Sequence, residues 1–411
     1  MIKTAWIRHD WKIICFGFVL MFFSSPGQTY FVSLFSGEIR QQLHLSHGEF
    51  GSLYSLATLF SAIVLLWTGS LYDRISIRRF STLLAVALAI GCALVASAYH
   101  VIWLFIGIFV VRHVGQSLMG LTASTSMMVF VPDHKAKANA LSYTGYSFAE
   151  ATLPSVLVAL LLYLSWREVW WLVALVIVLL LPALFKFLLQ HYQASPAADT
   201  TDTARANSQY QWTRVEVLSD PVFYLVIPGL LSQSFLYTGF MFHQIHMVAI
   251  KGWSLEHWAS LYILFSTTAL ITGFVIGILV DRCSARRVAP WINLPMIVGL
   301  LLLANVDAFW AAILFMLFMA LSTAGQAATS APFLAERYGT KYLGSIKSLT
   351  SFTMVLFTSV SPALIGLLID AGIDFDRLLV GDAAYASLVT ATAMIGCRIA
   401  VSRQVPATTS P

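Results

Sequence analysis

Two charged residues lie within long apolar stretches of the chain, Arg112 in VIWLFIGIFVVRHVG and Glu150 in LSYTGYSFAEATLPSVL. A charge in such a stretch is energetically costly and is usually retained for a function. Burial and a neighbouring cation shift the pKa of a carboxyl group in opposite directions, so this pair could bind and release a proton near neutral pH. The alternative is a static ion pair that only fixes helix packing.

The composition indicates that these charges lie in a membrane. Of the 411 residues, 58% are hydrophobic and 10% are charged, whereas a soluble domain carries roughly 25% charged residues. Backbone that faces lipid must satisfy its own hydrogen bonds, so long apolar runs predict helices. We predict an all-α membrane protein with twelve transmembrane helices, near residues 11–36, 48–72, 79–98, 101–130, 137–164, 168–190, 218–249, 255–280, 287–305, 308–335, 344–370 and 381–401.

These spans put both charges near the middle of the bilayer. Counted from the helix ends at residues 101 and 137, Arg112 lies about 17 Å deep and Glu150 about 20 Å deep. The two residues are on consecutive antiparallel spans. We therefore predict that they face a central cavity and interact directly or through water.

The basic residues predict the orientation. Most of the 24 Lys and Arg residues fall on the side of the N-terminus, and the positive-inside rule assigns that side to the cytoplasm. Both termini are expected there, and the net charge of +5 is explained by topology without a nucleic-acid partner. A cleaved signal peptide is the alternative for the first run, but this run is longer than a signal-peptide core and is expected to be retained.

Recognisable catalytic and metal-binding patterns are missing from the sequence. The four cysteines, Cys15, Cys92, Cys283 and Cys397, have no paired spacing, so neither a disulfide framework nor a metal site is predicted. There is no phosphate-binding loop of the GxxxxGK[ST] type and no recognisable nucleophile and base. We predict that the protein is not an enzyme and uses no cofactor or metal.

The chain contains two copies of one unit. GSLYDRISIRR at residues 69–79 recurs as GILVDRCSARR at residues 277–287, and the two glutamines Gln28 and Gln116 match Gln233 and Gln326. The segment between the copies is rich in Ala, Ser, Thr and Asp, as is typical of a flexible linker. The predicted domains are an N-terminal six-helix bundle at 1–191, a cytoplasmic linker at 192–214 and a C-terminal six-helix bundle at 215–411.

The repeated loop resembles the loop motif of the major facilitator superfamily of secondary transporters. The residues at the motif positions are Gly69, Asp73, Arg74, Arg78, Arg79, Gly277, Asp281, Arg282, Arg286 and Arg287. Ser76 and Ser284 stand where the family usually has a second glycine, so a tighter or differently wound turn is expected. The resemblance covers essentially the whole chain and implies two six-helix bundles related by a pseudo-two-fold axis. It makes the two loops candidate cytoplasmic latches; the alternative is that their arginines only set topology.

The resemblance also implies a central cavity lined by the first, fourth, seventh and tenth helices. The predicted substrate-cavity residues are Gln28, Tyr30, Gln116, Gln233, Tyr237 and Gln326. For any one glutamine, interhelical hydrogen bonding is the alternative. Arg112 matches the arginine of the family's fourth-helix motif, which implies proton coupling or binding of an anionic substrate. Arg112 and Glu150 are accordingly the predicted proton-coupling residues.

Two further features have simple packing interpretations. Pro26 and Gly27 can loosen the first helix, and an ordinary kink is favoured over a gate. His243 and His246 are spaced to share a helical face. They could sense pH or bind a metal, but a packing role is favoured because two ligands are too few.

From the resemblance we expect a bacterial inner-membrane transporter that works as a monomer by alternating access. Its cargo is expected to be a small organic solute, with an anionic one favoured by Arg112, and uptake is expected to be coupled to protons, as in a symporter. The alternative is a proton-driven drug or metabolite efflux antiporter, but the fifth helix lacks the Gly-Pro pair and repeated glycines of that group. A transporter-like sensor is disfavoured because the sequence has no sizeable soluble domain to pass on a signal.

Overall fold

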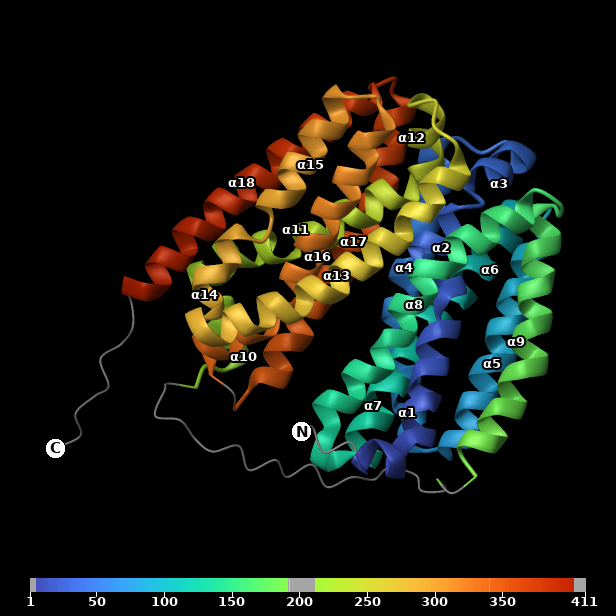
Figure 1. Cartoon of the computed structure of the whole chain (residues 1–411), viewed down its shortest axis with the longest axis horizontal. Helices are drawn as coiled ribbons and strands as arrows, with labels where there is room; N and C mark the ends of the chain where they lie inside the picture. Colours follow the sequence, from blue (N-terminus) through green and yellow to red (C-terminus); the bar gives the residue numbers. More distant parts are fainter. Residues whose placement is uncertain (1–4, 191, 193–210, 340, 403–411) are drawn as a thin grey trace. The chain divides into compact units, whose positions relative to one another are not determined.

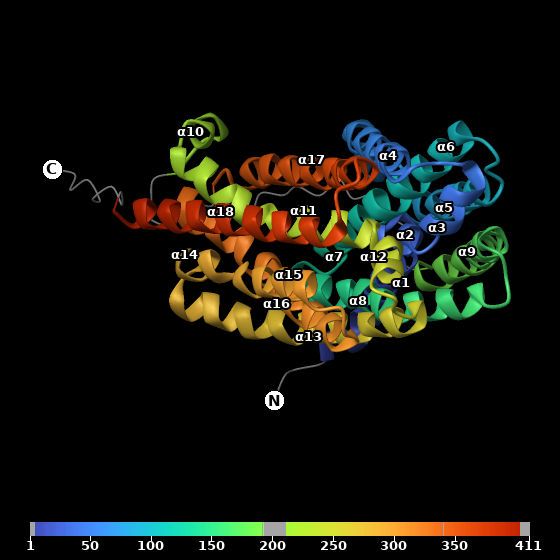
Figure 2. The same ribbon diagram turned by 90° about the horizontal axis from the view of Figure 1, so that it is seen from above.

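The computed structural model describes residues 5–190, 192, 211–339 and 341–402 (Figures 1 and 2). Its described residues form helices and connecting loops, and twelve of the helical segments are long and apolar enough to cross a membrane. The chain is therefore an all-α, multi-pass membrane protein, as the sequence predicted. The spans are His9–Ser33, His47–Tyr72, Ile77–Ala96, Val101–Phe130, Lys137–Leu161, Trp166–Leu188, Pro221–Phe242, Leu255–Cys283, Ala285–Asn305, Phe309–Tyr338, Leu343–Asp370 and Phe375–Ile399.

The chain forms two compact units. Unit 1 holds the first six spans together with residues 241–249 and 254–263, and unit 2 holds the remaining spans. The segments 241–249 and 254–263 come from the second half of the sequence, so the units do not follow a single cut in the chain. Most of the predicted linker at 192–214 lies outside the described residues.

Successive spans of unit 1 run in opposite directions between its two ends. The end that carries the N-terminus, predicted to be cytoplasmic, is called the basic end, and the other is called the opposite end. The elements of unit 1 are α1 (Ala5–Phe23), η1 (Ser25–Gly27), α2 (Thr29–Ser33), α3 (Ser36–Leu43), α4 (His47–Thr68), η2 (Gly69–Asp73), α5 (Ile77–Ala96), α6 (Val101–Val111), η3 (Arg112–Met119), α7 (Gly120–Phe130), η4 (Pro132–His134), α8 (Lys135–Leu161), α9 (Trp166–Leu188), α12 (Gln244–Ile250) and the start of α13 (Leu255–Cys283).

Unit 2 has its own apolar core, in which Phe223, Val226, Phe333 and Tyr338 are almost fully buried. Large apolar side chains on its outer faces, such as Phe274 at 69% exposure, are suited to lipid. Its elements are α10 (Arg214–Leu218), α11 (Pro221–Phe242), most of α13, α14 (Ala285–Val288), η5 (Ala289–Trp291), α15 (Leu294–Asn305), α16 (Phe309–Tyr338), α17 (Leu343–Asp370) and α18 (Phe375–Ser402).

Three helices begin with a capping box, which explains why they start where they do. Ser46 with Glu49, Ser165 with Glu168, and Thr213 with Glu216 each exchange side-chain and backbone hydrogen bonds across the first turn. This arrangement satisfies amide donors that a helix leaves free at its N-terminus. The caps therefore fix the starts of α4, α9 and α10.

The seventh span is shorter than the sequence predicted. An apolar run near 218–249 was expected to form one helix, but α11 ends at Phe242 and a separate helix, α12, begins at Gln244. His243, Gln244 and His246 stand at this break, so polar residues in the sequence already interrupt the apolar run there. The consequence is that α12 packs in unit 1 while α11 remains in unit 2.

Candidate functional site

The first span is broken where it crosses the fourth. After α1 ends at Phe23, a single 3-10 turn carries Pro26 and Gly27, and Gln28 then takes an extended conformation before α2 begins. Proline removes a backbone donor and ends the helical pattern. The predicted kink is thus a full interruption, which frees backbone carbonyl groups inside the span.

The fourth span is also irregular at this crossing, because η3 is a π-helical segment between α6 and α7. Gly27 and Gly115 let the two backbones touch. A methyl group added at Gly27 would press on the carbonyl of Val111, and one added at Gly115 would lie 2.9 Å from the carbonyl oxygen of Ser24. π-helical turns are rare and often occur at functional sites.

Arg112 is the first residue of η3 and is 1% exposed. Its Nε donates to Thr58 Oγ1 at 3.0 Å, its Nη1 donates to the freed carbonyl of Gly27 at 2.8 Å, and its guanidinium lies 4.7 Å from the centre of the Tyr54 ring. Its Nη2 is buried without a hydrogen-bond partner among the described residues. An unmade hydrogen bond at a buried charge is costly, so Nη2 is poised to receive an acceptor from a ligand or water.

Glu150 is 6% exposed and accepts a hydrogen bond from the Tyr146 hydroxyl at 3.2 Å. The Tyr146 ring stands edge-on to that of Tyr30 at 6.1 Å, and Tyr146 also lies within electrostatic reach of Arg112. The contacts of Arg112 described above include no carboxylate, and Tyr146 is a side chain that interacts with both charges. A link between Arg112 and Glu150 through water stays a prediction.

The other predicted cavity residues of unit 1 differ in burial. Tyr30 is buried and donates to Ser25 Oγ at 2.8 Å, so its hydroxyl is already used within the broken span. Gln28 is half-buried, with its amide nitrogen 3.4 Å from Ser24 Oγ. Gln116 is exposed on η3, one residue beyond the glycine crossing. The three side chains therefore belong to the segments that meet at this crossing.

In unit 2 the predicted glutamines join α11 to α16. Gln233 donates to Thr323 Oγ1, while Gln326 and Ser234 face each other at 2.8 Å. This is the interhelical hydrogen bonding that was the alternative interpretation for each glutamine. Tyr237 is half-buried and stacks on Phe265, with ring centres 5.5 Å apart. That the four glutamines line one cavity stays a prediction.

In unit 1 the loop motif begins in a 3-10 turn and its basic side chains are exposed. Gly69 begins η2, and Ser76 has ordinary extended angles, φ −56° and ψ 137°. The basic side chains Arg74, Arg78 and Arg79 are exposed. The side chain of Asp73 lies outside the described part of the chain, so its predicted latch role stays a prediction.

In unit 2 the loop motif is hydrogen-bonded to Glu336, an acidic residue outside the motif. Gly277, Asp281 and Arg282 lie within the continuous helix α13, and Arg287 is exposed at the turn. Ser284 has a positive φ of 82°.

Glu336 of α16 caps the helix that follows this turn. It accepts hydrogen bonds from the Ala285 amide at 2.7 Å and from Ser284 Oγ at 2.8 Å. Arg286 donates in turn to the backbone carbonyl of Glu336 at 2.5 Å. The turn is thus differently wound in unit 2, as expected, whereas the turn of unit 1 is ordinary.

Three polar groups were missed in the sequence analysis. His113 is buried beside Arg112, with Nε2 3.0 Å from Thr68 Oγ1 and its ring stacked on Phe109. Asp382 lies inside the last span. A search for every ionisable residue in the predicted spans would have found both.

The third is Gln244 of α12, whose amide is fully buried in unit 1. Its nitrogen donates to Ser33 Oγ at 2.7 Å, and its oxygen accepts from Trp258 Nε1 at 2.7 Å and from the Tyr262 hydroxyl at 2.9 Å. These bonds hold α12 and the start of α13 against α2 at the opposite end. The sequence offers no signal for them, because the partners come from distant segments.

The described residues contain no cluster of three or more His, Cys, Asp or Glu side chains that could hold a metal ion. His47 joins the predicted pair, with its ring 4.2 Å from that of His246 and 5.7 Å from that of His243. The three rings pack α4 against α12 within unit 1. This contact agrees with the packing interpretation of the two histidines.

Comparisons with known proteins give a family and a fold. The family model described as Major Facilitator Superfamily matches residues 17–264. The structure is similar to that of a bacterial homolog of the human lysosomal transporter Spinster in an inward-facing, unoccupied conformation, with a TM-score of 0.73, 13% identity, and coverage of 96% of this chain and 98% of that chain. It is also similar to a point mutant of the nucleoside transporter NupG, with a TM-score of 0.69, 13% identity, and coverage of 93% of this chain and 99% of that chain. A comparison with curated protein sequences gives no match.

Proposed function

Because this chain belongs to the Major Facilitator Superfamily, we propose that it takes up a small organic anion together with protons, through a site built around Arg112. The chain is a secondary transporter. We further infer that it acts as a monomer in the bacterial inner membrane, with both termini in the cytoplasm, by alternating access. The basic residues gathered at the N-terminal side of the spans support this orientation.

The observation that carries the proposal is the environment of the Arg112 guanidinium. Two of its nitrogens are used by Thr58 and Gly27, while Nη2 is buried and without a partner in the described part of the chain. A carboxylate is the natural acceptor for such a group, since charge-assisted hydrogen bonds are strong in a low-dielectric site. The broken first span beside it supports a substrate role, because secondary transporters often build their sites from interrupted helices.

Glu150 is the proposed proton carrier. It is buried in the same unit as Arg112, and its carboxylate accepts from Tyr146, which lies near Arg112 as well. Proton binding would neutralise Glu150, and binding of an anion would neutralise Arg112. Loading both would therefore reduce the cost of moving the site through a low-dielectric environment.

Efflux is the second candidate. The fifth span lacks the Gly-Pro pair and repeated glycines of drug and proton antiporters, which favours uptake. Substrate range decides between the two, because an anionic requirement at Arg112 would exclude most cationic drugs.

The test of substrate class is counterflow in proteoliposomes that contain the full-length protein. A panel of monocarboxylates, nucleosides, sugars and cationic drugs would be offered with and without a pH gradient. We expect carboxylates to exchange, and Arg112→Gln to abolish that exchange. Arg167→Gln is the matched control, because Arg167 also binds backbone carbonyls, those of Ala96 and Ala98, but lies at the opposite end of unit 1.

The test of proton coupling uses Glu150→Gln, which should abolish accumulation driven by a pH gradient while sparing exchange. Asp382→Asn is the comparison, because Asp382 is also a carboxylate within a span. Unchanged accumulation in Glu150→Gln would contradict the coupling role. Exchange of neutral or cationic solutes alone would contradict the anionic site.

A further inference from the structure

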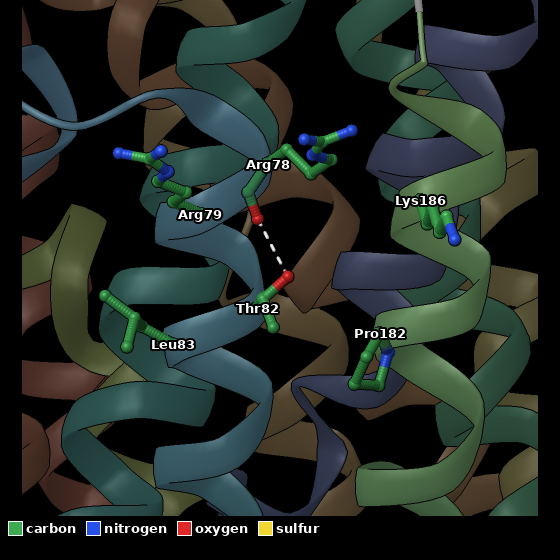
Figure 3. Close-up of a pocket in the computed structure, with 6 residues that line it drawn as sticks. All are labelled: Arg78, Arg79, Thr82, Leu83, Pro182 and Lys186. Carbon is green, nitrogen blue, oxygen red and sulfur yellow. Dashed lines mark hydrogen bonds between the residues drawn. The ribbon is translucent and has the colours of Figure 1, made fainter.

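A groove of 520 Å³ opens between α5 and α9 at the basic end of unit 1. Figure 3 shows the side chains of Arg78, Arg79, Thr82 and Leu83 on one helix, and those of Pro182 and Lys186 on the facing one. These six residues line the groove, which we call the α5–α9 groove. It is separate from Arg112 and Glu150, which lie inside other spans.

The groove is basic at one end. Arg78, Arg79 and Lys186 are exposed, and none of them forms an ion pair with another described residue. No carboxylate is among the lining residues. Arg78 and Lys186 approach the groove from different helices, so their like charges repel each other across it.

The repeat explains why this charge is unbalanced. In unit 2 the matching arginine, Arg286, contacts Glu336 of the tenth span. Gly115 aligns with Gly325, and in the same register Glu336 aligns with Ser126. Ser126 instead pairs with the hydroxyl of Tyr72 at 3.1 Å. Unit 1 thus keeps Arg78 but has Ser126 at the position where unit 2 has the acid that contacts Arg286.

The same groove is apolar toward the middle of the spans. Leu83 is 56% exposed, and Ile90 continues the outward face of α5, while Leu179 does so on α9. At the basic end, Trp11 and Phe187 are exposed aromatics, and the Lys12 amine lies 5.3 Å from the Phe187 ring. Basic groups next to exposed aromatics are typical of the headgroup level of a membrane.

We propose that the α5–α9 groove binds an anionic phospholipid, with the phosphate between Arg78 and Lys186 and an acyl chain along Leu83 and Pro182. A soluble anion would use the basic end but gain nothing from the apolar part. Basic pockets between transmembrane helices on the cytoplasmic side are suited to acidic headgroups. The bound phosphate replaces the repulsion between the two helices with attraction and so ties α5 to α9.

The experiment measures lipid retention by native mass spectrometry of the full-length protein in detergent. Phosphatidylglycerol, phosphatidylcholine and inorganic phosphate are added separately. Near a membrane surface each basic residue contributes about 1 kcal/mol to binding of acidic lipid, so the double variant Arg78→Gln with Lys186→Gln should bind phosphatidylglycerol about 30-fold more weakly. The wild type should also gain thermal stability from phosphatidylglycerol but not from the other two additives.

The matched control is the double variant Arg282→Gln with Arg287→Gln. It removes the same charge from exposed positions of the repeated loop that do not line the groove, and it should bind phosphatidylglycerol as the wild type does. Leu83→Trp fills the groove without changing its charge and should also weaken binding, which keeps the test valid if the charge variant does not fold.

Three results would overturn the proposal. Equal losses in the two double variants would show diffuse charge attraction without a site. Equal stabilisation by inorganic phosphate would show a site for free anions, and equal retention of phosphatidylcholine would show no headgroup selection.

Discussion

The two copies of the loop motif have nearly the same sequence but different partners. In unit 2, Glu336 caps α14, accepts from Ser284 and holds Arg286. In unit 1 the aligned residue is Ser126, and the arginines of the loop remain exposed. The comparison shows that the motif specifies a turn and its positive charge, while a residue some fifty positions later decides what that charge binds.

The largest effect is expected from removing the acid in unit 2. Glu336→Gln loses charge-assisted hydrogen bonds to the start of α14 and the ion pair with Arg286, which should cost about 2 kcal/mol of stability. The midpoint of thermal unfolding in detergent measures this loss. Ser126→Ala is the control in unit 1, where a single hydroxyl contact is lost, and it should cost less. Equal losses at the two positions would contradict the asymmetry.

At the two turns, replacing alanine by glycine is expected to change the stability in opposite directions and by a smaller amount. Ser284 has a φ of 82°, which favours glycine, whereas Ser76 has a φ of −56°. At position 284 glycine should be more stable than alanine by about 1 kcal/mol, and at position 76 it should be less stable by about 0.5 to 1 kcal/mol. Comparing glycine with alanine at each site removes the hydroxyl from both variants. The same order of stability at the two sites would contradict the difference in winding.

The smallest effect concerns the pH dependence of stability, through His246 of unit 1 and Lys251 of unit 2. Burial and the nearby Arg40 lower the pKa of His246 in unit 1. In unit 2 burial acts to lower the pKa of Lys251, but its hydrogen bonds to Asp307 and Asp376 outweigh burial and raise the pKa. The His246 contribution is therefore present above the ordinary histidine pKa, roughly 6.5, and is lost as pH falls. The Lys251 contribution is present below the ordinary lysine pKa, roughly 10.4, and is lost as pH rises through its raised value.

Unfolding midpoints of two variants across pH separate these contributions. His246→Asn should reduce the loss of stability in acid, and Lys251→Met should reduce the loss in alkali. The groups near His246 include Arg40 and His47, and the His47 ring also contacts that of His243 in the turn before α12. His47→Asn therefore serves as the second variant in acid. Unchanged pH profiles in these variants would show that other groups control the pH response.

Sequence reasoning predicted the fold because the signals for it are local. Apolar runs of sufficient length are sufficient to predict twelve spans, and the repeated loop at residues 69–79 and 277–287 predicts the duplication. The break at Phe242 was missed because the polar residues His243, Gln244 and His246 were counted as part of one apolar run, although α12 packs in unit 1 and α11 in unit 2.

The candidate site was predictable only in part. Arg112 and Glu150 stand out because charges in apolar helices are rare. Their partners, Thr58, Gly27 and Tyr146, are ordinary residues whose roles depend on which segments meet. Glu336 and Gln244 were missed for the same reason, since each acts on a segment distant in the sequence.

Through its hydrogen bond to the carbonyl of Gly27, the Arg112 guanidinium has two roles. It completes the backbone of an interrupted helix, and it offers its remaining nitrogen to an acceptor from outside. Any solute that draws the guanidinium toward itself must loosen that carbonyl, in a place where no methyl group could fit between Gly27 and the neighbouring backbone. On the binding role proposed for Arg112, occupancy would be converted into strain in the main chain of the first span, without a separate sensing element.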